Sequence, residues 1–122
     1  MRDIASNIGV RPALAPTEYS AATNGETIDR KGFEKVAFAV VSGDATGSLT
    51  FKVQDSDDGT TFADADAKYI IGEAPAAIEA NSAYKIGYWG HKRYQRIALT
   101  GTGTADVAAV AILSGANSRP VA

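Results

Sequence analysis

The segment DSDDGTTF has the composition of a calcium-binding loop. Asp55, Asp57 and Asp58 supply three carboxylates within four residues, and Gly59 follows them. Carboxylate oxygens are ligands that Ca²⁺ prefers, but the calcium loop of helix–loop–helix proteins needs ligands at positions 1, 3 and 5 and glycine at position 6. Counted from Asp55, position 5 is already Gly59, and although Asp66 falls at position 12, the flanking sequence is typical of strands. The spacing favours a solvated hairpin turn over a bound metal ion.

A second group combines aromatic and basic side chains in the stretch YWGHKRYQR, residues 88–96. Nucleic-acid grooves use this mixture, because cations contact phosphates and rings stack on bases. Alternating rings on a strand more often belong to a core, and basic groups beside a turn are usually solvated or paired with carboxylates. We therefore expect ordinary surface or contact with an acidic protein surface before nucleic-acid binding. The candidate partner contacts here are Trp89, His91, Lys92 and Arg93.

The sequence offers few of the residues that catalysis requires. His91 is the single histidine, and the chain has no cysteine. Catalysis by a serine nucleophile needs a histidine base with an orienting acid, and a zinc site normally needs three or more ligands. The GTGTAD segment, residues 101–106, lacks the lysine and the helix of a phosphate-binding loop. No pair among the fourteen acidic residues stands out for glycoside hydrolysis. We expect no enzyme activity, catalytic residue, metal site or cofactor.

Composition narrows the class of protein further. A net charge of −2 over 122 residues creates no field that would attract nucleic acid or an anionic membrane. Without cysteine, the fold must depend on packing and hydrogen bonds. The first ten residues lack the apolar core of a secretory signal, so we expect the chain to be made in the cytosol. The longest apolar stretch, residues 107–113, is far shorter than the ~20 residues of a membrane-spanning helix.

An extended N-terminal arm is predicted for residues 1–23. Pro12 and Pro16 lack a backbone donor and force extended backbone, which excludes a helix after Val10. Apolar residues spaced mostly by two indicate that the arm docks on its own domain or on a neighbouring molecule, and every strand is expected downstream of it. The candidate contacts are Ile4, Ile8, Val10, Pro12, Leu14 and Pro16.

The first half of the remaining chain reads as strands. Residues 35–41, KVAFAVV, are rich in β-branched and aromatic side chains, which predicts a strand buried on both faces and closed by a turn at residues 42–44. In residues 48–54, SLTFKVQ, apolar and polar side chains alternate, which predicts a strand with one solvated face. The Asp58-Gly59 turn predicts a hairpin, with Phe62 returning to the core.

The second half predicts further strands. Residues 83–89 and 93–100 flank a turn at residues 90–92, which predicts a second hairpin. The alanine-rich run at residues 105–113 predicts a last strand in close contact with another sheet or chain. Residues 68–71 could form a short strand, and residues 73–82 fit either a helical turn or a loop.

These patterns predict an all-β fold. Several short strands without a sustained helical period indicate an antiparallel β-sandwich or jelly-roll-like single domain. We assign residues 1–23 to the arm, residues 24–116 to the sandwich and residues 117–122 to a polar C-terminal tail.

The order of several segments carries a family resemblance. GETIDRKGFEKVAFAVVSG, LTFKVQDSDDGTTFADA, YKIGYWGHKRYQRIAL and VAAVAILSG follow one another over residues 25–120. Together they resemble small β-sandwich virion proteins encoded among the structural genes of tailed phages and related prophages. The resemblance implies a non-enzymatic particle component, with capsid decoration (cement) protein or minor head protein as the leading role. It supplies no functional residues.

The expected partners and alternatives follow. The leading hypothesis is a subunit on the virion head surface that binds and stabilises the shell as a homo-oligomer, for example a trimer, with the major capsid protein or other virion proteins as partners. A tail or neck component is a close competitor. The alternative from another class is a carbohydrate- or receptor-binding sandwich, in which Tyr88, Trp89 and Tyr94 would form a stacking platform.

Overall fold

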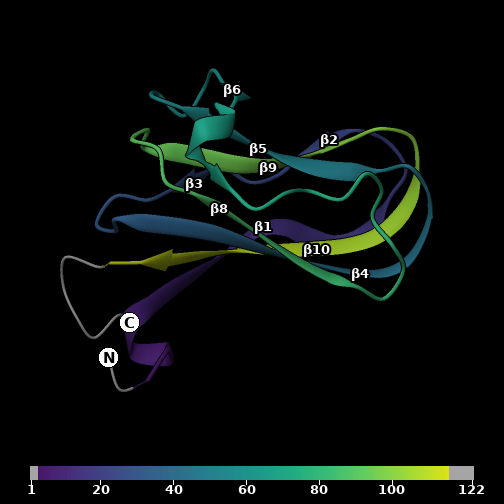
Figure 1. Ribbon diagram of the computed structural model, residues 1–122, viewed down its shortest axis with the longest axis horizontal. Helices are drawn as coiled ribbons and strands as arrows, with labels where there is room; N and C mark the ends of the chain where they lie inside the picture. Colours follow the sequence, from purple (N-terminus) through teal and green to yellow (C-terminus); the bar gives the residue numbers. More distant parts are fainter. Residues whose placement is uncertain (1–2, 116–122) are drawn as a thin grey trace.

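Strand-forming sequence fills most of the chain, and the computed structural model, which describes residues 3–115, arranges it in two antiparallel sheets (Figure 1). Sheet A contains, in spatial order, β1 (Ile8–Tyr19), β10 (Gly103–Ser114), β4 (Lys35–Gly47), β8 (Ala83–Tyr88) and β7 (Ile70–Ile71). Sheet B contains β2 (Thr23–Asn24), β9 (Tyr94–Thr100), β5 (Thr50–Ser56) and β6 (Ala63–Asp64), and β3 (Ile28–Asp29) also pairs with β9. The predicted all-β sandwich is confirmed.

The core lies between the two sheets. Strand β5 shows the predicted alternation, because Phe51 and Val53 are buried while Thr50 and Lys52 are partly exposed. Across the sandwich, the ring of Phe51 lies 6.0 Å from that of Tyr84 in β8. Each large side chain buried in this way contributes roughly 1.5–3 kcal/mol. Packing of the inner faces therefore holds the sheets together.

The segment predicted as an arm forms an edge strand over much of its length. Strand β1 lies within residues 1–23 and pairs with β10, whereas the sequence placed every strand further downstream. Leu14 is 3% exposed and belongs to the chain's own core. Register shifts adjoin Leu14 on both sides, and an edge strand tolerates Pro12 and Pro16 because one side of it needs no ladder hydrogen bonds. Residues 1–2 and the predicted tail, residues 117–122, lie outside the described residues.

One of the two predicted hairpins forms. Strands β5 and β6 pair around the Asp58-Gly59 turn, as expected. The turn at residues 90–92 instead crosses between the sheets, since β8 pairs with β4 and β7 while β9 pairs with β2, β3 and β5. Alternation identifies the buried face of a strand but not its partner, so the prediction of a second hairpin was wrong. The Arg30 guanidinium supports the crossing by donating to the carbonyl oxygens of Gly90 and Lys92, each at 2.8 Å.

Strand β4 differs from its prediction in length and burial. It continues through residues 42–44, where a register shift opposite Asp106 replaces the expected turn. Only one of its faces is buried, because alternate residues point away from sheet B, and Val41 is 54% exposed. The prediction of a strand buried on both faces was therefore wrong for the single chain.

The segments left open in the sequence adopt short or irregular structure. Residues 67–71 form the 3-10 helix η2 (Ala67–Tyr69) and then β7. Residues 73–82 contain no helix and run as a loop, in which the buried Ile78 donates its backbone N–H to the Leu49 carbonyl at 2.7 Å. The other helix is η1 (Ala5–Asn7). No helix within residues 3–115 has the length and hydropathy needed to span a membrane.

We predict that Leu14→Ala lowers the free energy of unfolding by about 2–4 kcal/mol, because it leaves a cavity in the core. Val10→Ala, on the exposed side of the same strand, should cost less than about 1 kcal/mol. Urea unfolding of both variants measures the difference. Equal, small losses would show that β1 does not pack on its own domain in solution.

Candidate interaction surfaces

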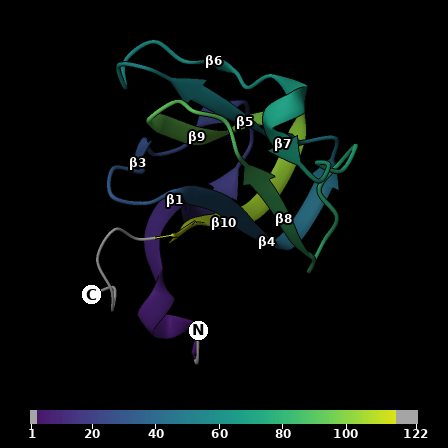
Figure 2. The ribbon, with the colours of Figure 1, turned by 60° about the vertical axis from the view of Figure 1, so that its left-hand side comes forward.

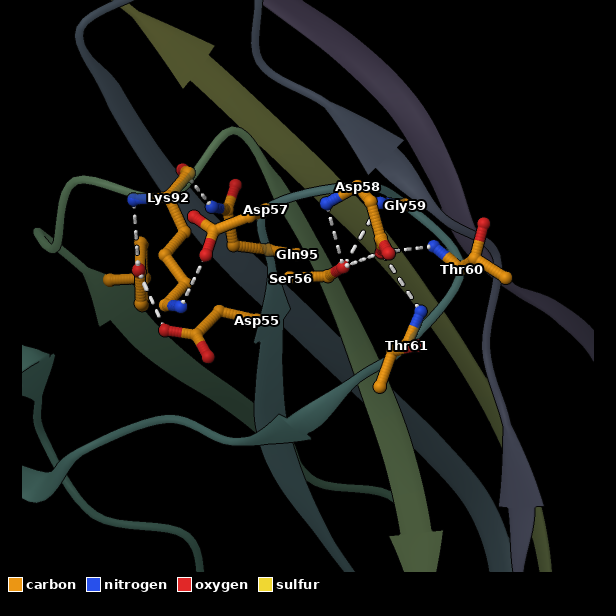
Figure 3. A network of polar contacts seen from close by, with 10 residues as sticks. Asp55, Ser56, Asp57, Asp58, Gly59, Thr60, Thr61, Lys92 and Gln95 are labelled. Carbon is orange, nitrogen blue, oxygen red and sulfur yellow. Dashed lines mark hydrogen bonds and ion pairs between the residues drawn. The ribbon is translucent and has the colours of Figure 1, made fainter.

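The acidic segment after β5 closes a turn. The Asp58 carboxylate accepts hydrogen bonds from the backbone N–H groups of Thr60 and Thr61, both at 2.9 Å, and from the Ser56 hydroxyl at 2.8 Å (Figure 3). These donors, Thr61 first, lower the pKa of Asp58 to about 2. The Ser56 hydroxyl oxygen in turn accepts from the Gly59 N–H at 2.9 Å. The Asp58 side chain thus accepts the hydrogen bonds that backbone N–H groups of its own loop donate.

The neighbouring carboxylates have other partners. Asp55 is buried and accepts from the Tyr88 hydroxyl at 2.8 Å, while Asp57 forms an ion pair with Lys92 at 2.9 Å. Figure 3 shows Asp55 and Asp57 directed toward Lys92, away from Asp58. Within residues 3–115 no group of three or more His, Cys, Asp or Glu side chains is arranged to hold a metal ion. The three aspartates therefore act separately, each in a structural contact.

Tyr88 is an internal link between the sheets. It is 2% exposed, its hydroxyl binds Asp55 of sheet B, and burial followed by the Asp55 hydrogen bond raises its pKa to about 12. Tyr94 is half-buried with the Arg93 guanidinium 5.0 Å from its ring centre. The three-ring platform considered for sugars is therefore not assembled, because of its members only Trp89 is largely exposed.

The basic residues of the turn lie in local contacts. Arg93 forms a two-point pair with Asp29 at 2.8 and 2.7 Å, and this hydrogen bonding lowers the pKa of Asp29 to about 2. Lys92 pairs with Asp57, as described above. His91 is exposed, with its ring edge-on to Tyr69 at 5.7 Å. Two of these cations are therefore neutralised within the chain, which weakens the expectation that they contact an acidic partner.

The candidate residues of the N-terminal segment are distributed over different surroundings. Ile4 is exposed next to η1, which extends away from the two sheets (Figure 2). Ile8 is half-buried, and Leu14 is buried in the core. The other three candidates, Val10, Pro12 and Pro16, are exposed residues of β1. The first two lie on the outer face of sheet A.

Apolar residues occupy most of the outer face of sheet A across its five strands, and Lys85, opposite Ala39, is the charged exception among them. In one row Val10 lies opposite Ile112, Ile112 opposite Ala37, Ala37 opposite Gly87, and Gly87 opposite Ile71. Parallel rows place Pro12, Val110 and Ala39 side by side, and then Ala108, Val41 and Ala83. We call this set the apolar face. Its members are all exposed or half-buried: Val10, Pro12, Ala37, Ala39, Val41, Ile71, Ala83, Gly87, Ala108, Val110 and Ile112.

A groove of about 580 Å³ deepens one side of the apolar face. Ile71 and Trp89, which are 61% and 62% exposed, line it together with Ala37 and Gly87. Lys35 and Lys85 also border it. The structure thus brings Trp89 and Val10, predicted separately, onto one side of the molecule at opposite edges of sheet A.

Sequence reasoning missed Ile71, Val41 and Val110 as surface residues. Continuous apolar runs in β4 and β10 were a usable signal, because a strand that packs on one side only normally alternates with polar residues. The alanine content of β10 did indicate contact with another sheet or chain. The register of five strands was needed to show that these residues form one surface.

We predict that Tyr88→Phe lowers the free energy of unfolding by about 1–3 kcal/mol, because the buried Asp55 carboxylate loses a hydrogen-bond donor. Tyr84→Phe is the matched control. Its hydroxyl accepts from the exposed Glu79 N–H at 3.0 Å, so the loss should stay below about 1 kcal/mol. Denaturant unfolding of both variants gives the comparison, and similar losses would contradict a structural role for the Tyr88–Asp55 pair.

A second prediction concerns pH. Because the folded-state pKa of Asp29 is lowered from 3.8 to about 2, its ion pair stabilises the fold above that range and is lost as pH falls through it. Both partners are nearly half-exposed, so solvent screening keeps the contribution of the ion pair to stability small. Asp29→Asn should therefore destabilise the protein slightly at neutral pH and not at about pH 2. Urea unfolding at both pH values checks this, with Asp44→Asn as control; a pH-independent difference would contradict it.

The fold has similar structures at low sequence identity. The SPBc2 prophage-derived protein YomS matches with a TM-score of 0.61 over 88% of this chain and 92% of that chain, at 13% identity. A chain of the Bacillus endospore appendages, which form disulfide-linked pili, matches with a TM-score of 0.51 over 96% of this chain and 98% of that chain, also at 13% identity. No family model and no curated protein matches. At this identity, the two structures show a shared fold.

Proposed function

We propose that this chain is a non-enzymatic structural subunit of a tailed-phage particle, with capsid decoration or minor head protein as its role. The observation that carries the proposal is the contrast between its surfaces. Polar groups at the end of the sandwich bind one another in structural pairs, such as Tyr88 with Asp55 and Arg93 with Asp29. The apolar face remains open to contact, and open apolar surfaces of this extent mark protein interfaces.

The two similar structures support an assembly role. One comes from a prophage, which agrees with the family resemblance of the sequence, and the other belongs to a pilus. The pili are disulfide-linked, whereas this chain contains no cysteine. Its subunits would therefore join through noncovalent contacts, whose weak individual affinities add up when an interface is repeated around a particle.

Contact with the shell is assigned to the N-terminal segment. Ile4 is exposed and directly precedes η1, which lies outside the two sheets (Figures 1 and 2). An apolar residue on a projecting segment can reach a neighbouring subunit without disturbing the sandwich. Removal of residues 1–7 would delete η1 but no strand. The sugar- or receptor-binding alternative has less support, because Trp89 has no second exposed ring from the predicted platform.

The test is co-sedimentation of the purified chain with particles that lack it, with heads and tails separated beforehand. We expect the full chain to bind heads at saturable occupancy. Deletion of residues 1–7 should weaken binding at least about tenfold, corresponding to one buried apolar side chain, while the melting temperature stays close to that of the full chain. Binding to tails alone would make the chain a tail component, and binding to neither fraction would overturn the proposal.

A further inference from the structure

The apolar face has the properties of a sheet surface that packs on another sheet. Val41 and Val110 are 54% and 37% exposed. The sequence predicted burial on both faces for the strand of Val41, and close contact with another sheet or chain for the strand of Val110. Every strand described belongs to sheet A or sheet B, so none forms a third layer beyond sheet A (Figure 1). We propose that the apolar face of one chain binds the apolar face of a second copy, so that two sandwiches stack through sheet A.

The apolar face carries both projecting side chains and a recessed area, so its shape can complement that of a second copy. Alanine and glycine occupy its middle at Ala37, Ala39 and Gly87, leaving a shallow floor, while Val110 and Val41 project beside it. The groove next to Ile71 and Trp89 gives the partner's projecting side chains a place to insert. Stacked sheets approach to about 10 Å by interdigitating large and small side chains in this way. A single face that carries both ridge and groove fits a copy of itself.

The area is that of a small contact. The three rows hold five, three and three apolar positions, each covering about 4.8 Å by 6.8 Å of sheet, which gives roughly 360 Å² per copy, or about 700 Å² in a pair. The exposed Trp89 ring beside the groove adds to this area and brings the contact toward the roughly 1,000 Å² of the smaller specific interfaces. Lys85 is the one charged residue within the three rows, so stacking desolvates few ions. It lies opposite Ala39 in the middle row, and its long side chain can carry the ammonium group toward the β7 edge of the sheet and into solvent.

Charges at the ends of the face indicate the orientation of the two copies. Lys35 begins β4, and the acidic residues Asp44 and Asp106 lie near the opposite end of the sheet. None of the three forms an ion pair within residues 3–115. When two copies stack with their strands antiparallel, Lys35 of each approaches the acidic end of the other. The same arrangement brings the two Lys85 residues to one side of the stack, where their long side chains can separate the ammonium groups into solvent. The complementarity of Lys35 with the acidic end favours a second copy over a partner of unrelated charge pattern.

The inference rests on the proposed role as an assembly subunit, but it is tested on the purified chain. Sedimentation velocity over a concentration series measures the dissociation constant of the pair, and Trp89, the single tryptophan, reports burial by a fluorescence shift to shorter wavelength. Val110→Lys places a charge at the centre of the face. We expect it to weaken association at least about 100-fold, because the ammonium would be buried without a partner. Val41→Lys repeats the test one row away.

Ala63→Lys is the matched control, since Ala63 is an exposed strand residue of sheet B. It should leave the dissociation constant unchanged, and all three variants should keep β-rich circular dichroism. A chain that stays monomeric at high concentration, or a pair that survives both valine substitutions, overturns the inference. Loss of head binding in Val110→Lys, with a monomeric wild type, would show that the face docks another virion protein instead. Self-association without particle binding would sustain this inference and overturn the proposed function.

Discussion

Burial of one face of each sheet is the constraint on which the rest of the structure depends. The inner faces meet through large side chains such as Phe38, Phe51 and Leu99, which are almost completely buried. A chain of 122 residues builds these two layers, and no described strand forms a third. The outer face of sheet A is nevertheless largely apolar. The fold therefore buries its inner apolar surfaces and leaves one outer apolar surface exposed.

Polar residues close the end of the sandwich without a disulfide. Tyr88 in sheet A donates to Asp55 in sheet B, and Arg30 holds the crossing segment by its carbonyl oxygens. These contacts use the charged and aromatic groups that looked most suitable for chemistry in the sequence. A buried tyrosine with a raised pKa could suggest catalysis in isolation. Here its hydroxyl is a structural link, and the surface available for binding lies elsewhere.

Local patterns predicted what depends on neighbours in sequence. Alternation around Phe51 identified a strand with one buried face, and Asp58-Gly59 identified its hairpin. Partner choice depends on contacts distant in sequence, which is why the turn after Tyr88 was misassigned and β1 was read as an arm. Trp89 and Val10 were singled out as candidate partner contacts, and both are exposed, but only strand register shows that they lie on one side of sheet A with Ile71 and Val110.

The edges of the sheets explain why the proposed association uses the apolar face and not edge pairing. Four edge strands, β7, β2, β3 and β6, have two residues each, and the fifth, β1, carries Pro12, Pro16 and two register shifts. Short strands, prolines and irregular register all discourage the addition of a strand from another molecule. Face stacking needs none of these backbone groups, because it depends on side-chain packing alone. The same sequence that protects the edges therefore leaves the flat, apolar side of sheet A as the surface for the proposed contact.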